Sequence, residues 1–194
     1  MAFVGVPKMV LRQTCRSPSV LRVAITPDTK DWTWVLERPC PDCGFDAASF
    51  AREDVAGMIR ANAVAWQPVL ARARAARRPN DSMWSPLEYG CHVRDVYRIC
   101  AGRLELMLTQ DDPTFPNWDQ DATAEEDAYR SQNAARVAVE LLDAAAVIAD
   151  RFAAVSGDQW ERPGTRSDGS HFTVESFARY VIHDPIHHLA DVGA

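Results

Sequence analysis

The fold is decided by residues 85–107, SPLEYGCHVRDVYRICAGRLELM. Ser85, Pro86 and Glu88 form the pattern of a helix capping box with proline at the first helical position. Apolar side chains then recur every three or four positions, at Tyr89, Val93, Val96, Cys100, Leu104 and Met107. This spacing predicts a long amphipathic helix that ends near residue 110.

Two further helices flank this one. Residues 52–77 carry a helical pattern, in which Pro68 should bend or break the helix. On the other side, TAEE at Thr123–Glu126 reads as a second capping box. It predicts an alanine-rich helix that runs to about residue 155, where Gly157 is suited to end it.

A fourth helix is predicted to begin at Thr173, a suitable N-cap, and to carry Phe177, Val181 and Ile182 toward a histidine-rich stretch. The segment before it, residues 156–172, is rich in glycine, serine and charged residues. We expect this segment to form an exposed loop or a small hairpin.

Four helices of this size predict an all-α fold, a four-helix bundle. The short polar link of residues 78–84 suits antiparallel neighbours. The connection between the second and third helices, DDPTFPNWDQDA (residues 111–122), is long enough at ~3.3 Å per residue to run back along the bundle. The predicted topology is therefore up-down-down-up, with a long crossover between helices two and three.

At 194 residues and 47% apolar composition, the chain can bury one substantial core. We expect residues 1–25 to be a disordered tail, or an extension from an early start codon. Residues 26–51 are predicted to be an extended arm that carries a CxxC pair, and residues 52–194 the bundle. No apolar run approaches the roughly 20 residues of a membrane span, and the N-terminus has no signal-peptide core.

A net charge of −6 argues against nucleic acid as a partner, and the basic run Arg72–Arg78 suits a solvated helix end. The five cysteines are odd in number and irregularly spaced. This pattern indicates reduced thiols and a cytoplasmic protein. The lack of a membrane-length apolar run indicates no membrane partner.

The stretch YVIHDPIHHLADV (residues 180–192) holds three of the five histidines. His183 and His187 are four residues apart. If the helix continues through Pro185, they share one face of it and could bind a metal ion together. The helix could also kink at Pro185, or restart there with Asp184 as its N-cap, which would separate the two histidines.

His92, about two turns into the second helix, is the candidate third ligand. The alternative is a partly buried histidine whose hydrogen-bond partner is Glu88 or Asp95. His188 should point about 100° away from the two-histidine face. His171 lies in the polar loop and is not expected to be a ligand.

The pair Cys40 and Cys43, in RPCPDCGFD, has the spacing of half a zinc knuckle, but no second cysteine pair completes four ligands. We expect a proline-rich turn that leads into the first helix. A redox role, or an arm that folds over the open end of the metal site, are the alternatives.

Two motifs resemble the DinB-like superfamily. MWSPLEYGCHVRDV (residues 83–96) resembles its second-helix motif, in which a tryptophan and a helix cap precede a metal-binding histidine. VIHDPIHHLADV (residues 181–192) resembles its last-helix motif, a histidine followed one turn later by a second. The resemblance covers about residues 50–192. It includes the N-terminal domain of mycothiol-dependent maleylpyruvate isomerases and the bacillithiol transferases.

By position, the resemblance implies a divalent metal on His92, His183 and His187, although some members have a carboxylate where His183 stands. Zn²⁺ is the first expectation, with Ni²⁺ or Fe²⁺ as alternatives. Three imidazoles leave coordination positions open, as at a catalytic site, where the metal lowers the pKa of bound water or a thiol.

The resemblance further implies a metal-dependent thiol S-transferase or isomerase that joins a low-molecular-weight thiol such as mycothiol to a small electrophile. Glu88, Asp95 or His188 could orient a ligand imidazole, and no catalytic residue is identified. The alternative is a non-catalytic, stress-related metal-binding bundle that forms a homodimer. An open cavity over the histidines would favour the enzyme.

Overall fold

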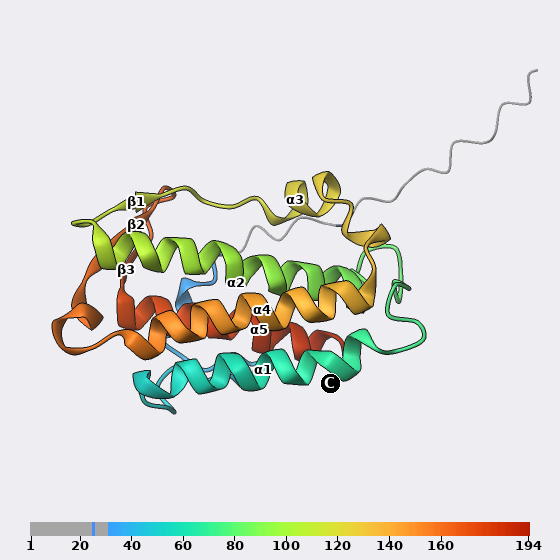
Figure 1. The fold of residues 1–194 in the computed structure, drawn as a ribbon, viewed down its shortest axis with the longest axis horizontal. Helices are drawn as coiled ribbons and strands as arrows, with labels where there is room; N and C mark the ends of the chain where they lie inside the picture. The colour runs from blue at the N-terminus through green and yellow to red at the C-terminus, as the bar shows by residue number, and fades with distance from the viewer. Residues whose placement is uncertain (1–24, 26–30) are drawn as a thin grey trace, which may run out of the picture.

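The computed structural model describes residue 25 and residues 31–194, so the predicted tail lies outside the described residues apart from Ile25. Four long helices dominate the fold: α1 (Val55–Leu70), α2 (Pro86–Thr109), α4 (Ala134–Ala154) and α5 (Val174–Asp191). They pack against one another as a single bundle (Figure 1). The predicted all-α four-helix bundle is confirmed. Within the described ranges, no helix is long and apolar enough to cross a membrane.

The helices run up-down-down-up, as predicted. In Figure 1, α1 and α5 run from left to right, and α2 and α4 run from right to left. Hydrogen bonds agree with these directions, because Arg72, just after α1, donates to the backbone oxygen of Val192, just after α5, at 2.7 Å. The long crossover returns along the outside of α2, so that α2 and α4 are parallel and pack closely.

Two of the predicted helix caps form as expected. Ser85 N donates to Glu88 Oε2 at 2.8 Å, and Glu88 N donates to Ser85 Oγ at 3.3 Å, which closes the capping box of α2. At α5, Thr173 Oγ1 accepts from Ser176 N at 3.1 Å. Both caps satisfy backbone N–H groups that have no partner inside the helix.

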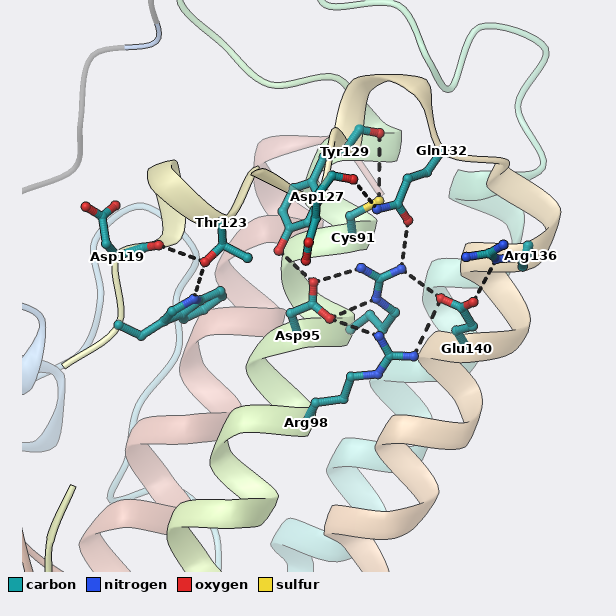
Figure 2. Close-up of polar contacts among 12 residues, drawn as sticks. Cys91, Asp95, Arg98, Asp119, Thr123, Asp127, Tyr129, Gln132, Arg136 and Glu140 are labelled. Carbon is teal, nitrogen blue, oxygen red and sulfur yellow. Dashed lines mark hydrogen bonds and ion pairs between the residues drawn. The ribbon is translucent and has the colours of Figure 1, made fainter. Parts of the chain in front are cut away.

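The predicted capping box at Thr123–Glu126 is wrong. These residues lie inside a separate short helix, α3 (Gln120–Glu126), which Asp119 caps by accepting from Ala122 N at 2.9 Å. The Thr123 hydroxyl instead accepts from the Trp118 indole at 2.7 Å and donates to the backbone oxygen of Asp119 (Figure 2).

The chain then turns before the long α4 begins. Ala128 has a left-handed φ of +49°, and the 3₁₀ turn η3 (Tyr129–Ser131) follows. Asn133 caps α4 by accepting from Arg136 N at 3.0 Å. The third long helix therefore starts 11 residues later than Thr123, at Ala134.

The first helix is shorter than predicted. Residues 52–54 form a 3₁₀ turn (η2, Arg52–Asp54), and α1 passes Pro68 but ends two residues later at Leu70. The basic run Arg72–Arg78 that follows forms turns rather than a helix end. Arg72 there donates to the backbone oxygens of Val192 and Gly193, just after α5, where a cation suits the negative end of the helix dipole.

A small sheet lies at one end of the bundle (Figure 1). β2 (Pro163–Arg166) pairs with β3 (His171–Thr173) in an antiparallel hairpin, and with β1 (Thr114–Phe115) in parallel. The 3₁₀ turn η4 (Gly157–Glu161) precedes the hairpin. The hairpin expected within residues 156–172 is confirmed, and it leads directly into α5.

The described part of the N-terminal arm is folded rather than extended. It forms the 3₁₀ turn η1 (Thr33–Leu36), which packs on α5, followed by a tight turn at residues 40–44. Val35 is buried, and Cys40 and Phe45 belong to the common hydrophobic core. The arm is therefore part of the globular unit and contacts the helix that carries three histidines.

A buried ionic network ties α2 to α4 and η3 (Figure 2). Arg94 Nε and Nη2 donate to the two oxygens of Asp95 at 2.9 and 2.8 Å, and Arg94 Nη1 donates to Glu140 at 2.8 Å. The Tyr129 hydroxyl donates to Asp95 at 2.6 Å. Burial alone would raise the pKa of Asp95, but the hydrogen bonds from Arg94 and Tyr129 lower it below its ordinary value.

We expect Asp95→Asn to lower the free energy of unfolding by about 3 kcal/mol at pH 7, because Arg94 would keep a buried charge with one carboxylate fewer. The wild-type carboxylate stabilises the fold above the ordinary aspartate pKa of about 3.9, and this contribution is lost as the pH falls through the lower folded-state pKa. Urea denaturation between pH 3 and 7 should show a deficit that shrinks below about pH 4. The exposed Asp143→Asn on α4 should change stability by no more than about 0.5 kcal/mol.

Candidate metal centre

Helix α5 continues through Pro185 without interruption, from Val174 to Asp191. Each residue of an α-helix turns by about 100°, so residues four apart share a face and adjacent residues do not. His183 and His187 therefore lie on one face of α5. Asp184 and His188 lie on the neighbouring face. This division decides which groups meet in the bundle.

One group of metal-ligand atoms joins α2 to α5. It consists of His92, Asp184 and His188, whose nitrogen and carboxylate oxygen atoms all lie within 4.8 Å of one another. His92 Nε2 is 3.2 Å from Asp184 Oδ1, and His188 Nε2 is 3.7 Å from the same oxygen. Two imidazoles and one carboxylate are a ligand set for Zn²⁺ and for Fe²⁺ at catalytic sites.

The three side chains of this group form few good hydrogen bonds with one another, as expected if they bind one cation together. The bond between His92 Nε2 and Asp184 Oδ2 is long, at 3.4 Å, and the nearer oxygen, Oδ1, is buried without a hydrogen bond. Burial alone would raise the pKa of Asp184, but His92 and His188 beside it lower that pKa well below its ordinary value. The carboxylate is therefore charged at neutral pH and suits a divalent metal.

The surroundings fix the orientation of both imidazoles. The His92 ring stacks on Trp118, with centroids 5.2 Å apart and planes within 4°, and lies 5.4 Å from Trp84. Nδ1 of His188 is 2.8 Å from Asp191 Oδ2, and this contact leaves Nε2 directed to Asp184. A carboxylate on the far nitrogen is the usual partner of a metal-binding histidine. His92 Nδ1 is buried and has no such partner.

A cavity of about 820 Å³ opens beside this group. Asp184 and His188 line it, together with the three indoles of Trp32, Trp84 and Trp118. Two arginines and several carboxylates complete the wall: Arg103, Arg166, Asp31, Asp119, Asp121, Asp168 and Asp191. The group therefore faces a space large enough for small-molecule substrates.

The structure divides the predicted ligands His92, His183 and His187 between two groups. His92 meets Asp184 and His188, whereas His183 and His187 meet a second group formed with the cysteines of the arm. His183 is 3% exposed, and burial, helped by the nearby His187, lowers its pKa to about 4, so that its imidazole is neutral.

Glu88 and Asp95 do not orient a ligand imidazole, in contrast to the expectation from sequence. Glu88 accepts hydrogen bonds from Ser85 and Arg78, and Asp95 accepts from Arg94 and two other side chains. His188, expected to orient a ligand, is itself in a ligand group. His171 is in the hairpin beside Thr165, away from both groups.

Sequence reasoning missed two features of this region. Asp184 and His188 have the same four-residue spacing as His183 and His187, one position later, so the pattern contained both pairs. The spacing Cys-x₂-Cys with His-x₃-His was also present, and it is the spacing of mixed zinc sites.

A four-helix bundle with a ligand group of imidazole and carboxylate beside an open cavity defines the class of metal-binding helical bundles. The chain belongs to the DinB superfamily, whose sequence model matches residues 60–192. The expected family resemblance is confirmed.

Among solved structures, YfiT from Bacillus subtilis has a similar fold, with a TM-score of 0.62 at 17% sequence identity. The match covers 74% of this chain and 86% of YfiT. YfiT is described as a probable metal-dependent hydrolase with an unusual four-helix bundle topology. At this identity, the likeness shows the fold alone. No curated protein matches this chain.

We expect His188→Ala to weaken binding of Ni²⁺ or Zn²⁺ at the α2–α5 group by more than about 100-fold, because it removes one of three ligands. Isothermal titration calorimetry of the metal-free variant should show one class of metal sites fewer than the titration of wild type. His171→Ala, which removes a histidine outside both groups, is the matched control and should leave the titration unchanged. Equal affinity in His188→Ala and wild type would exclude His188 as a ligand.

Proposed function

We propose that the protein is a metal-dependent enzyme whose centre is the group of His92, Asp184 and His188. The observation that carries the proposal is that three ligand side chains converge, and that two of them, Asp184 and His188, line an open cavity of about 820 Å³. Three protein ligands leave coordination positions for a substrate, whereas a structural ion is enclosed by four. Zn²⁺ is the metal that we expect first, with Ni²⁺ or Fe²⁺ as alternatives.

A divalent metal at this group would supply Lewis acidity, which lowers the pKa of a bound nucleophile. The chain contributes the rest. Asp184 supplies a negative charge that offsets part of the charge of the cation. Asp191 holds the tautomer and direction of His188, and the indoles of Trp84 and Trp118 clamp the ring of His92. The ligands are thus held rigidly before substrate enters.

The reaction that we favour is transfer of a low-molecular-weight thiol, mycothiol-like in size, to a small electrophile. The cavity volume suits two small molecules at once. Its wall combines indole faces, which suit an apolar electrophile, with Arg103 and Arg166, which suit the polar groups of a thiol cofactor. Some members of the superfamily that the sequence resembles carry out thiol transfer, and this supports the same choice.

Hydrolysis is the second candidate. It is favoured by the description of YfiT as a probable metal-dependent hydrolase, and a metal that activates a thiol can also activate water. The non-catalytic, dimeric metal-binding bundle is less favoured, because a purely structural ion does not need an open cavity beside it. The homodimer stays a prediction.

To test the proposal, metal-depleted protein is reloaded with Zn²⁺, Ni²⁺ or Fe²⁺ and assayed with a chromogenic electrophile and a set of small thiols. A p-nitrophenyl ester without thiol is assayed in parallel to detect hydrolysis. We expect turnover that depends on metal and falls by at least about 100-fold in Asp184→Asn and His188→Ala, because each loses a ligand.

Glu105→Gln, which changes an exposed carboxylate of α2, is the control and should keep full activity. Thiol-dependent product identifies the transferase, and ester cleavage alone identifies the hydrolase. Turnover that survives chelation, or that is equal in both ligand variants and wild type, would contradict a metal-dependent mechanism at this group.

A further inference from the structure

The second ligand group lies where the N-terminal arm meets α5. It contains Cys40 and Cys43 from the arm and His183 and His187 from α5, and their ligand atoms all lie within 4.8 Å of one another. We propose that this group, here called the arm clamp, is a structural Zn²⁺ site separate from the proposed catalytic centre. Two thiolates and two imidazoles are a common ligand set for structural zinc.

The distance between ligand atoms fits a tetrahedral ion. Cys40 Sγ is 3.6 Å from His187 Nδ1. A Zn–S bond of about 2.3 Å and a Zn–N bond of about 2.0 Å, at tetrahedral angles, place sulfur and nitrogen roughly 3.5 Å apart. The other ring nitrogen of His187, Nε2, faces Asp191 Oδ1 at 3.8 Å, which is the side where a carboxylate orients a zinc-bound imidazole.

The local fold of the arm presents both thiols to α5. Gly44 N donates to the backbone oxygen of Cys40 at 2.8 Å, and Cys40 N donates to the backbone oxygen of Phe45 at 2.7 Å. This tight turn uses a left-handed φ of +74° at Gly44, which favours glycine.

Two of the four ligands are buried and the other two are half-buried, which supports a largely closed site. Cys40 is 1% exposed and His183 is 3% exposed, and both cysteines are free thiols. Nε2 of His183 is buried without a hydrogen-bond partner, a cost that a metal ligand would remove. His183 and His187 border the cavity, but neither cysteine is among its lining residues. Four ligands would leave the ion no open position for a substrate.

The arm clamp has a consequence for the cavity. It would join residues that are 147 positions apart, Cys40 and His187, and so fix the arm on α5. The Trp32 ring, which lines the cavity, packs 5.4 Å from the ring of His183 and 5.0 Å from that of His187. A zinc ion here would therefore hold one wall of the proposed active site in place.

The first test is metal stoichiometry of protein purified under reducing conditions and loaded with Zn²⁺. We expect about two equivalents in wild type and about one in the Cys40→Ser/Cys43→Ser variant. Cys91→Ala, which removes a buried thiol outside both groups, should retain both. If the proposed catalytic centre binds no zinc but the arm clamp does, wild type holds about one equivalent of zinc, and the double cysteine variant holds none.

The second test needs no cysteine variant and reads the ligands directly. X-ray absorption at the zinc edge of His188→Ala protein, which lacks the other centre, should fit two sulfur ligands near ~2.3 Å and two nitrogen ligands near ~2.0 Å. Zinc bound by nitrogen and oxygen alone, metal content unchanged in the double cysteine variant, or a Cys40–Cys43 disulfide in the reduced, zinc-exposed protein would each overturn the proposal.

Discussion

The continuity of α5 through Pro185 is the constraint on which both ligand groups depend. A proline inside a helix removes one backbone hydrogen bond and costs about 3 kcal/mol, so packing on the bundle has to offset it. Because the helix does not restart at Asp184, the 100° step between neighbours places two pairs of ligands on adjacent faces. A restart would have separated His183 from His187.

The two faces of α5 meet different partners and therefore differ in chemistry. Toward α2, His92 completes a group of nitrogen and oxygen ligands beside an open cavity. Toward the arm, Cys40 and Cys43 complete a group of sulfur and nitrogen ligands, in which Cys40 and His183 are buried. Asp191, one turn further along α5, contacts a histidine of each group, so that the two groups share this carboxylate.

Local patterns in the sequence predicted the bundle well and the site only in part. The caps at Ser85 and Thr173 and the up-down-down-up topology followed from residue type and connection length. The cap at Thr123 did not form, because Asp119 caps α3 four residues earlier and Thr123 lies inside that helix. Spacing identified the histidines as candidate ligands but could not divide them between two groups, since that division depends on where a distant segment, the arm with Cys40, packs.

The central claim, that α5 carries two metal centres, is tested most directly by anomalous X-ray scattering from crystals of the zinc-loaded protein. The structure predicts two peaks, one bounded by His92, Asp184 and His188, and the other bounded by the two arm cysteines with His183 and His187. A single peak bounded by His92, His183 and His187 would contradict it, and would mean that α5 rotates on metal binding to form one three-histidine centre.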